Sequence, residues 1–384
     1  MCASSYYITI VSLKTISTEF GWPRSFTSSA YSILFLGMGI GGIFMGWWSD
    51  RIGVALPVAI GIVITAIGTI VAGASQGFIT FLIAHGILMG LLGNSALFVP
   101  LLAHITHWFD RRRGLAVGIV ATGQGVAGTI WIPVFTGVTE AVGWRTTFFY
   151  YGVFLICLLP MTLVLRRRPP GTDKPVTRST TSSHTVHPLG ISSNLLVGLL
   201  SIAIVGCCIS MAIPTVHLVS HVTDLGFTRV QGAEVVALTL ACSIVSRLAW
   251  GWISDRIGGL LTLFIGSFLQ TFAVFLFALA QDLAQLYLIG VFFGLAFGGI
   301  VPAYTIIMRH LLPPTSIGLR VGIVLLFGTI GMALGSWVGG QFFDLNGHYT
   351  YAFLVGVVAN MINLLIIGFL NIRYWQLQSK SKHV

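Results

Sequence analysis

Eight residues close one long apolar run, Gly46-Trp47-Trp48-Ser49-Asp50-Arg51-Ile52-Gly53, and they return 205 positions later as Gly251-Trp252-Ile253-Ser254-Asp255-Arg256-Ile257-Gly258. Upstream, Gly21-Trp22-Pro23-Arg24 and Gly226-Phe227-Thr228-Arg229 match at the same offset. A weaker echo pairs Val142-Gly143-Trp144-Arg145 with Asn346-Gly347-His348-Tyr349. An ordered match at one offset indicates internal duplication and not merely a shared apolar composition.

The composition excludes a soluble protein. Of the 384 residues, 55% are hydrophobic and only 8% are charged, where a soluble domain carries roughly 25% charged residues. Disordered chains need the opposite composition, so disorder is excluded as well. The 46 glycines, 26 phenylalanines and 10 tryptophans are typical of membrane helices that pack through small residues between aromatic belts.

The fold class that follows is an all-α membrane protein with twelve transmembrane helices in two six-helix, pseudo-symmetric bundles. Eleven apolar runs predict spans at residues 26–49, 55–75, 78–105, 114–138, 146–165, 193–221, 230–253, 260–280, 283–308, 317–342 and 350–372. The twelfth candidate, residues 1–20, starts at Met1 and carries Lys14. We therefore expect a short or truncated first helix, from a start set too late or from a truncated copy.

A polar stretch rich in Ser, Thr and Pro, residues 166–192, divides the chain. It predicts a flexible cytoplasmic linker between an N-terminal bundle, residues 1–165, and a C-terminal bundle with a short cytoplasmic tail, residues 193–384. Glycines repeated along residues 114–128 and 322–339 predict that the fifth and eleventh helices are closely packed.

The basic residues predict the orientation, because Lys and Arg gather on the cytoplasmic side of a membrane. With the linker in the cytoplasm, that side holds fifteen of them: Arg51, Arg111, Arg112, Arg113, Arg166, Arg167, Arg168, Lys174, Arg178, Arg256, Arg309, Arg320, Arg373, Lys380 and Lys382. The other side holds Arg24, Arg145 and Arg229. We expect both termini in the cytoplasm, in a bacterial cytoplasmic (inner) membrane. The net charge of +10 then needs no nucleic-acid partner.

The repeated octets resemble the loop that follows the second helix of each half in the major facilitator superfamily. Basic residues usually continue that pattern, whereas Val54-Ala55 and Gly259-Leu260 follow here. Trp108-Phe109-Asp110-Arg111-Arg112-Arg113-Gly114-Leu115-Ala116-Val117-Gly118 and Phe20-Gly21-Trp22-Pro23-Arg24-Ser25 are similar to the monocarboxylate and oxalate/formate transporter branch.

The resemblance implies that the two loops act as latches of a cytoplasmic gate, where a carboxylate at a neighbouring helix N-terminus is favoured by the helix dipole. Alternatively, these loops only cap the helices and fix the topology. The residues concerned are Gly46, Asp50, Arg51 and Gly53 in the first half and Gly251, Asp255, Arg256 and Gly258 in the second.

Arg247 is the first candidate for substrate binding. It interrupts an apolar helix, and such a charge normally faces a cavity or a partner. Its repeat counterpart is Gly42, so the fold does not require a charge there. The branch has a carboxylate-binding arginine at a similar place in its eighth helix, and guanidinium pairs well with carboxylate. Snorkelling to the nearby cytoplasmic interface is the alternative.

Further polar residues are also candidates for substrate binding. Tyr7, Lys14 and Thr18 share a helical face that Val11 interrupts, so Lys14 lies either on the pathway or at the outer interface. Uncharged candidates for lining a cavity are Asn94, Gln124, Tyr304 and Asn360.

The ion coupled to transport is left open by the sequence. Proton-driven members of the branch often carry an acid one turn before the arginine, where this chain has Ser243. Glu234 lies near the outer end of its helix, and His85, His217 and His221 could titrate near neutral pH. A metal at His217 and His221 would lack a third ligand, and we predict neither metal nor cofactor.

The function predicted is alternating-access transport of a small organic anion, with a monocarboxylate favoured, by a monomer in the lipid bilayer, with a proton as one candidate coupling ion. One alternative is a transporter or exporter of another small organic solute, with Arg247 structural. A non-transporting membrane sensor or a degenerate truncated copy is an alternative of another class. Zinc-protease, nucleophile-elbow and phosphate-loop patterns are missing, so no enzyme is expected.

Overall fold

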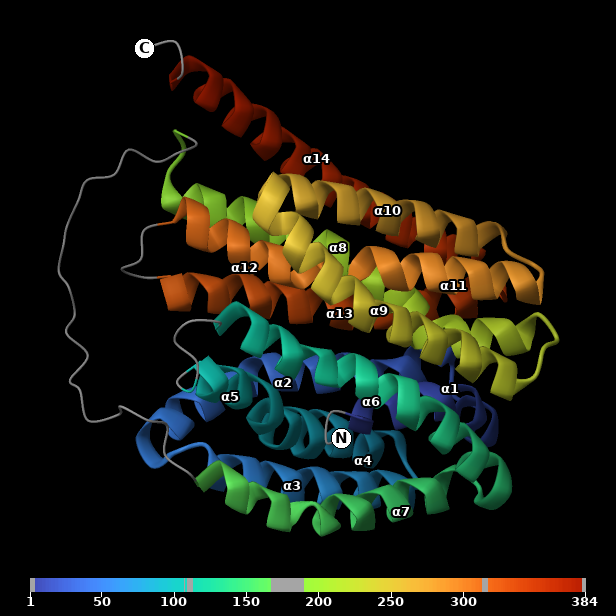
Figure 1. The fold of residues 1–384 in the computed structure, drawn as a ribbon. Helices are drawn as coiled ribbons and strands as arrows, with labels where there is room; N and C mark the ends of the chain where they lie inside the picture. Colours follow the sequence, from blue (N-terminus) through green and yellow to red (C-terminus); the bar gives the residue numbers. More distant parts are fainter. Residues whose placement is uncertain (1–3, 107, 109–112, 167–189, 313–316, 382–384) are drawn as a thin grey trace.

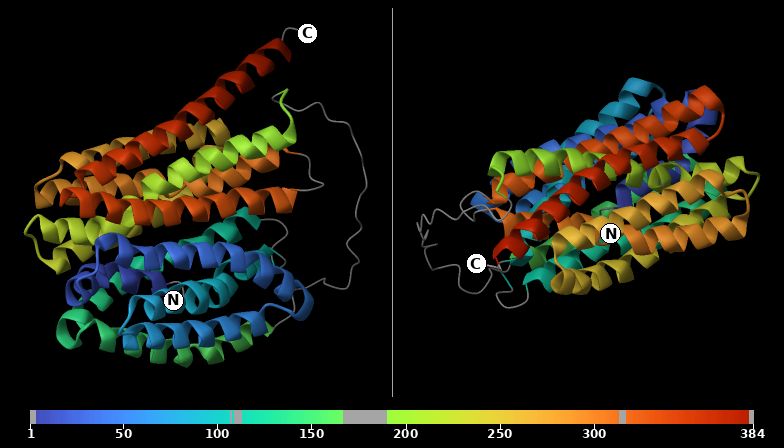
Figure 2. Two further views of the ribbon diagram at one scale, coloured as in Figure 1. Left: turned by 180° about the vertical axis from the view of Figure 1, so that it is seen from behind. Right: turned by 90° about the horizontal axis from the view of Figure 1, so that it is seen from above.

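The computed structural model describes residues 4–106, 108, 113–166, 190–312 and 317–381. Two helical bundles lie side by side with their helices running in roughly the same direction (Figure 1; Figure 2). We call residues 4–166 the N half and residues 190–381 the C half. The predicted flexible linker falls almost wholly outside the described residues.

The N half holds six runs of helix. They are α1 (Ser5–Phe20), α2 (Arg24–Ile52), α3 (Ala55–Ala74), the continuous run of α4 (Phe78–Ile83), the π-helix η2 (Ala84–Asn94) and α5 (Ser95–Thr106), α6 (Arg113–Val142), and α7 (Trp144–Cys157) with the 3₁₀ segment η3 (Leu159–Arg166).

The C half repeats this plan. Its runs are α8 (Ser193–Asp224), α9 (Arg229–Ile257), α10 (Gly259–Leu279), α11 (Leu283–Phe297) with α12 (Ile300–Leu311), α13 (Ile317–Asn346) and α14 (Thr350–Ser381). Among the described residues, eleven helices are long and apolar enough to cross a membrane, as the sequence predicted. The sixteen described residues of α1 span about 24 Å, less than the roughly 30 Å hydrocarbon core.

Glycines at the repeated motifs end the same elements in both halves. Gly53 (φ 88°, ψ 160°) and Gly258 (φ 83°, ψ 155°) adopt a conformation open almost only to glycine. Each donates its backbone N–H to the serine carbonyl four residues earlier, at 2.9 and 3.0 Å. The internal duplication is therefore present in the backbone as well as in the sequence.

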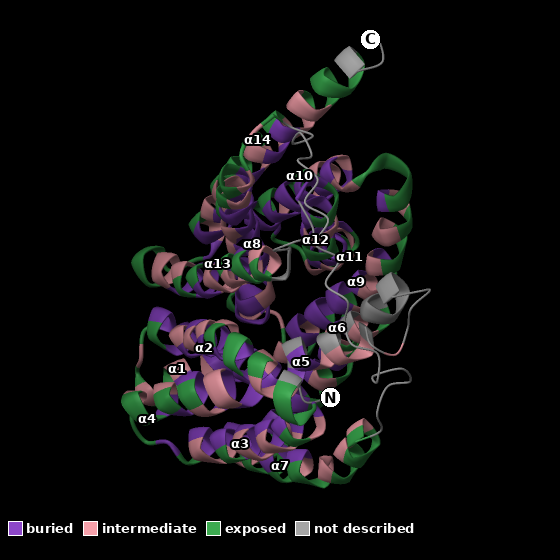
Figure 3. Ribbon diagram, turned by 90° about the vertical axis from the view of Figure 1, so that its left-hand side faces the viewer, coloured by how far each residue is buried: buried purple, intermediate pink, exposed green. Residues whose placement is uncertain are grey.

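The two ends of the helical bundles are named as follows. The linker end is the end where η3 finishes and α8 begins, on the left of Figure 1, and the distal end is the opposite one. Seen from the linker end, the buried faces of the helices turn toward neighbouring helices and the exposed faces turn outward (Figure 3). The apolar outer surface matches a lipid environment, in which exposed aliphatic side chains are favourable.

The halves meet along two helix pairs, α2 with α13 and α6 with α9. In the first pair Ser32 Oγ donates to the Ala333 carbonyl at 2.6 Å, and Ser336 Oγ donates to the Ser28 carbonyl at 3.0 Å. A Cβ on Gly39 would lie 3.2 Å from Thr329 Cβ, so this contact reaches about halfway along α2.

The predicted close packing of the fifth and eleventh helices, α6 and α13, holds over part of their length. A Cβ on Gly128 or Gly331 would collide with a neighbouring helix. On the part of α13 nearer the linker end, no described atom lies within 4 Å of a Cβ placed on Gly322, which shares the helix face of Ala333 and Ser336. The α2–α13 contact therefore covers the distal part of these helices and is open beside Gly322 near the linker end, whereas α6 and α9 still touch at Gly125 and Ile244.

Candidate functional site

Arg247 lies on α9, the helix that packs against α6 of the N half. The residue is half-buried, and its guanidinium is within electrostatic range of the phenols of Tyr6 and Tyr7 on α1. Both tyrosines are buried, with 5% and 3% of their surface exposed, and their ring centroids are 4.4 Å apart. A cation of the C half thus lies within electrostatic range of two phenols of the N half.

Three helices meet at this point because a glycine permits it. Tyr7 Oη donates to the Gln124 carbonyl on α6 at 3.1 Å. A Cβ on Gly128, one turn further, would lie 2.9 Å from Tyr7 Oη and would collide with Leu240 of α9. We call the meeting point of α1, α6 and α9 around Arg247 the arginine junction. It brings together Arg247, Tyr7 and Gln124 from the predicted site, and it adds Tyr6.

Further candidates from the sequence lie elsewhere. Asn94 is buried and donates to Ser5 Oγ at 2.9 Å and to the Met89 carbonyl at 2.7 Å, within the N half. Tyr304 is buried and donates to Asn363 Oδ1 at 2.8 Å, and Asn360 donates to Thr271 Oγ1 at 2.9 Å, both within the C half. These amides and hydroxyls satisfy one another inside one bundle, as buried polar groups must.

Lys14 lies at the distal end and not at the arginine junction. Its Nζ is 2.7 Å from Asp224 Oδ1, the last residue of α8. Arg24 at the start of α2 binds the same carboxylate through both terminal nitrogens, with Nη2 at 2.8 Å from Oδ1 and Nη1 paired with Oδ2. Sequence reasoning missed Asp224, because nothing local marks it as a partner for α1 and α2.

The Arg24 side chain is enclosed by the C half. Its guanidinium carbon lies 3.7 Å from the centroid of the Phe343 ring, and Nη1 donates to Tyr349 Oη at 2.8 Å. The backbone N–H groups of Arg24 and Ser25 donate to the two carboxylate oxygens of Asp344, each at 2.8 Å. We call Lys14, Arg24, Asp224, Asp344 and Tyr349 the distal cluster. It joins the first turn of α2 to α8 and α13.

His85, His217 and Glu234 are each held by hydrogen bonds, whereas the buried His221 packs its ring against Phe353. His217 Nε2 is 2.8 Å from the Ser336 carbonyl and its Nδ1 is 3.3 Å from Tyr349 Oη, just behind the distal cluster. His85 lies between Thr9 Oγ1 at 2.9 Å and the Phe81 carbonyl at 2.8 Å. Glu234 accepts a hydrogen bond from Tyr287. In the described part of the chain no group of three His, Cys, Asp or Glu residues is placed to hold a metal.

The two repeated loops have the same geometry at the linker end. Arg51 lies over the Trp47 ring at 4.1 Å, and Arg256 lies over the Trp252 ring at 3.7 Å. Such cation–π pairs contribute roughly 0.5–1 kcal/mol at exposed sites. Asp255 is exposed, whereas the side chain of Asp50 lies outside the described part of the structure.

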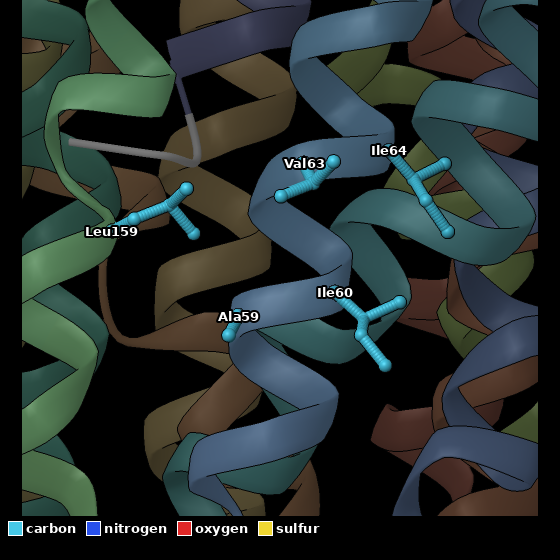
Figure 4. A pocket seen from close by; sticks show the side chains of 5 residues that line it. All are labelled: Ala59, Ile60, Val63, Ile64 and Leu159. Carbon is cyan, nitrogen blue, oxygen red and sulfur yellow. The ribbon is translucent and has the colours of Figure 1, made fainter.

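A surface groove between α3 and η3 is lined by Ala59, Ile60, Val63, Ile64 and Leu159 (Figure 4). All five are aliphatic, so this groove offers a polar ligand neither a charge nor a side-chain hydrogen bond. Among the described residues, the arginine junction and the distal cluster bring charged side chains to the interface between the halves.

Comparison with known proteins agrees with this architecture. The model of the Major Facilitator Superfamily matches residues 1–279 and 198–381. The chain is 26% identical over 311 residues to monocarboxylate transporter 13 of Rattus norvegicus, covering 80% of this chain and 71% of that protein. It is 25% identical over 342 residues to the uncharacterized MFS-type transporter YcxA of Bacillus subtilis, covering 87% and 83%.

The crystal structure of the nucleoside transporter NupG superposes with a TM-score of 0.72 at 14% identity, covering 97% of this chain and 96% of that one. At that identity the likeness establishes the fold alone.

Proposed function

The chain belongs to the Major Facilitator Superfamily, is a multi-pass membrane transporter and not an enzyme, and from this premise we propose that it carries a small organic anion, a monocarboxylate, by alternating access between its halves. The observation that carries the proposal is that Arg247 lies within electrostatic range of Tyr6 and Tyr7 of the opposite half. A guanidinium there can bind a carboxylate through two parallel hydrogen bonds.

The charge at the arginine junction favours a monoanion. Lys14, the second cation that the sequence offered, is held by Asp224 at the distal end. Among the described residues at the junction, Arg247 is then the cation that meets the cargo. A dicarboxylate would bring a second negative charge into a low-dielectric site without a partner, which costs several kcal/mol.

Alternating access requires the halves to part at one end at a time. The contacts of α2 with α13 over their distal part, with open space beside Gly322, support a state that is closed at the distal end and open toward the linker end. The excess of Lys and Arg at the linker end supports its placement, with both termini, in the cytoplasm. In the opposite state the Asp50–Arg51 and Asp255–Arg256 loops would latch that end. Since both halves lie in one chain, a monomer can perform the cycle.

Uptake by proteoliposomes tests the proposal. Wild-type protein is expected to accumulate labelled pyruvate or lactate, and Arg247→Ala is expected to reduce uptake to background while the protein is still made and folded. Arg309→Ala is the matched control, because Arg309 is an exposed arginine near the end of α12.

If Arg247→Ala transports these acids at the wild-type rate, the anion site is lost and the transport of another organic solute becomes the better proposal. The same vesicles test coupling. A pH gradient, acidic outside, raises the initial rate if a proton is carried with the anion.

A further inference from the structure

Asp224 is held in the way a free carboxylate ligand would be held. Arg24 binds both of its oxygens, and Lys14 Nζ adds a contact of 2.7 Å to Oδ1. Bidentate guanidinium with an added ammonium is among the strongest arrangements for a carboxylate in proteins. The distal cluster is therefore a carboxylate site that the chain fills itself.

The two sides of this site belong to different halves. Lys14 on α1 and Arg24 on α2 are both in the N half, and Asp224 on α8 is in the C half. The other carboxylate of the cluster, Asp344, is also in the C half and accepts the backbone N–H groups of Arg24 and Ser25. When the halves part at the distal end, both carboxylates move away with the C half and both cations stay behind.

The site can be reached from the distal side. The side chains of Arg24, Asp224 and Lys14 keep 9%, 22% and 33% of their surface exposed. Arg24 is thus mostly shielded while Asp224 and Lys14 border solvent. Two neighbouring cations that lose their carboxylates repel each other and favour a replacement anion.

We propose that Lys14 and Arg24 form a second carboxylate-binding site at the distal mouth of the pathway, for which Asp224 is the built-in competitor. It is separate from the arginine junction, since Lys14 and Tyr7 are seven residues apart on α1, about 10 Å along the helix. The inference rests on the proposed alternating access. An organic anion bound there stabilises the distal-open state, because it replaces the carboxylate that this state removes.

Calorimetric titration of purified protein with sodium pyruvate tests the site, with Arg247→Ala throughout so that the arginine junction cannot bind. Adding Asp224→Asn removes the competitor and is expected to tighten pyruvate binding about tenfold or more, as the loss of one competing charge-assisted pair should. Adding Lys14→Met to that variant is expected to reverse the gain. The neutral ester methyl pyruvate is expected not to bind.

Glu140→Gln is the matched control, because it removes one exposed negative charge at the same end of the molecule. If Arg247→Ala/Asp224→Asn binds pyruvate no more tightly than Arg247→Ala/Glu140→Gln, the distal site is refuted. If Asp224→Asn does not fold, the rise in melting temperature that pyruvate gives to Arg247→Ala is compared with that of Arg247→Ala/Lys14→Met. An equal rise in both, or no rise in either, also refutes it.

The two experiments distinguish a failure of the distal site from a failure of the proposed function. Tighter binding in the Asp224→Asn variant together with no pyruvate or lactate uptake by the wild type supports the distal site and contradicts monocarboxylate transport. Uptake by the wild type without tighter binding does the reverse.

Discussion

At the scale of single residues, the repeated glycines that close α2 and α9 carry the clearest constraint. Gly53 and Gly258 combine a positive φ with an extended ψ, a region that side chains with a Cβ avoid. The same chain also has glycines with ordinary helical geometry. Gly137, in the interior of α6, is exposed, and no described atom lies within 4 Å of the position that a Cβ would take there.

Substitution by alanine should change the free energy of unfolding in opposite directions at the two kinds of glycine. Gly53→Ala is expected to lower the free energy of unfolding by about 1–3 kcal/mol, the cost of a residue forced into that region. Gly137→Ala is expected to raise it by about 0.5–1 kcal/mol, the helix propensity of alanine over glycine. Thermal unfolding in detergent measures both. If Gly53→Ala melts at the same temperature as the wild type, the result contradicts the backbone geometry at this turn.

At the scale of helices, the starts of α2 and α9 are repeat-related but are capped differently. Asp344 of the other half caps α2 by accepting the N–H groups of Arg24 and Ser25. The start of α9 is capped from within, because Thr228 Oγ1 accepts the Gln231 N–H at 3.2 Å. A carboxylate at a helix N-terminus is favoured by the dipole and by the free N–H groups. The α2 cap therefore also holds the halves together, whereas the α9 cap does not.

Removing each cap should separate these roles. Asp344→Ala is expected to loosen the α2–α13 contact and to raise several-fold the rate at which an impermeant maleimide labels Ser32→Cys. Thr228→Ala is expected to cost about 1 kcal/mol of stability, as a lost N-cap does, and to leave that rate unchanged. Labelling of protein without Ser32→Cys gives the background from native cysteines. Equal rates in both variants would mean that Asp344 does not join the halves.

At the scale of the whole molecule, transport requires the α2–α13 contact to break and re-form. A Cβ on Gly39 would lie 3.2 Å from Thr329 Cβ across this contact, close to the spacing of roughly 3.5–4.5 Å in a disulfide. Gly232 and Val222 offer the same geometry within the C half, with a Cβ on Gly232 lying 3.3 Å from Val222 Cβ.

Cross-linking the two pairs should give opposite results. Oxidised Gly39→Cys/Thr329→Cys is expected to lose uptake by proteoliposomes and to regain it on reduction, because the halves can no longer part. Oxidised Gly232→Cys/Val222→Cys is expected to retain uptake, since that bond lies inside one half. Undiminished transport by the first protein, once its cross-link is verified on a gel, would rule out rocking of the halves about this interface.

The sequence by itself determined the helices and their duplication. Apolar runs of membrane length and turn glycines are local properties, so the predicted spans agree with the helices and mostly differ by a few residues at the ends, as with α6, which continues to Val142. It also singled out Arg247, because a charge in an apolar helix is conspicuous without knowledge of its neighbours.

The tertiary structure alone decided which polar groups meet. Lys14 and Asp224 are 210 positions apart, and Arg24 and Asp344 are 320 apart, so no local pattern could pair them. Lys14 lies in the distal cluster and Asn94 and Tyr304 in bonds within one half, because each buried polar group takes the nearest partner that helix packing supplies. Helix formation depends on residues adjacent in sequence, whereas charge pairing depends on which helix ends are brought together in space.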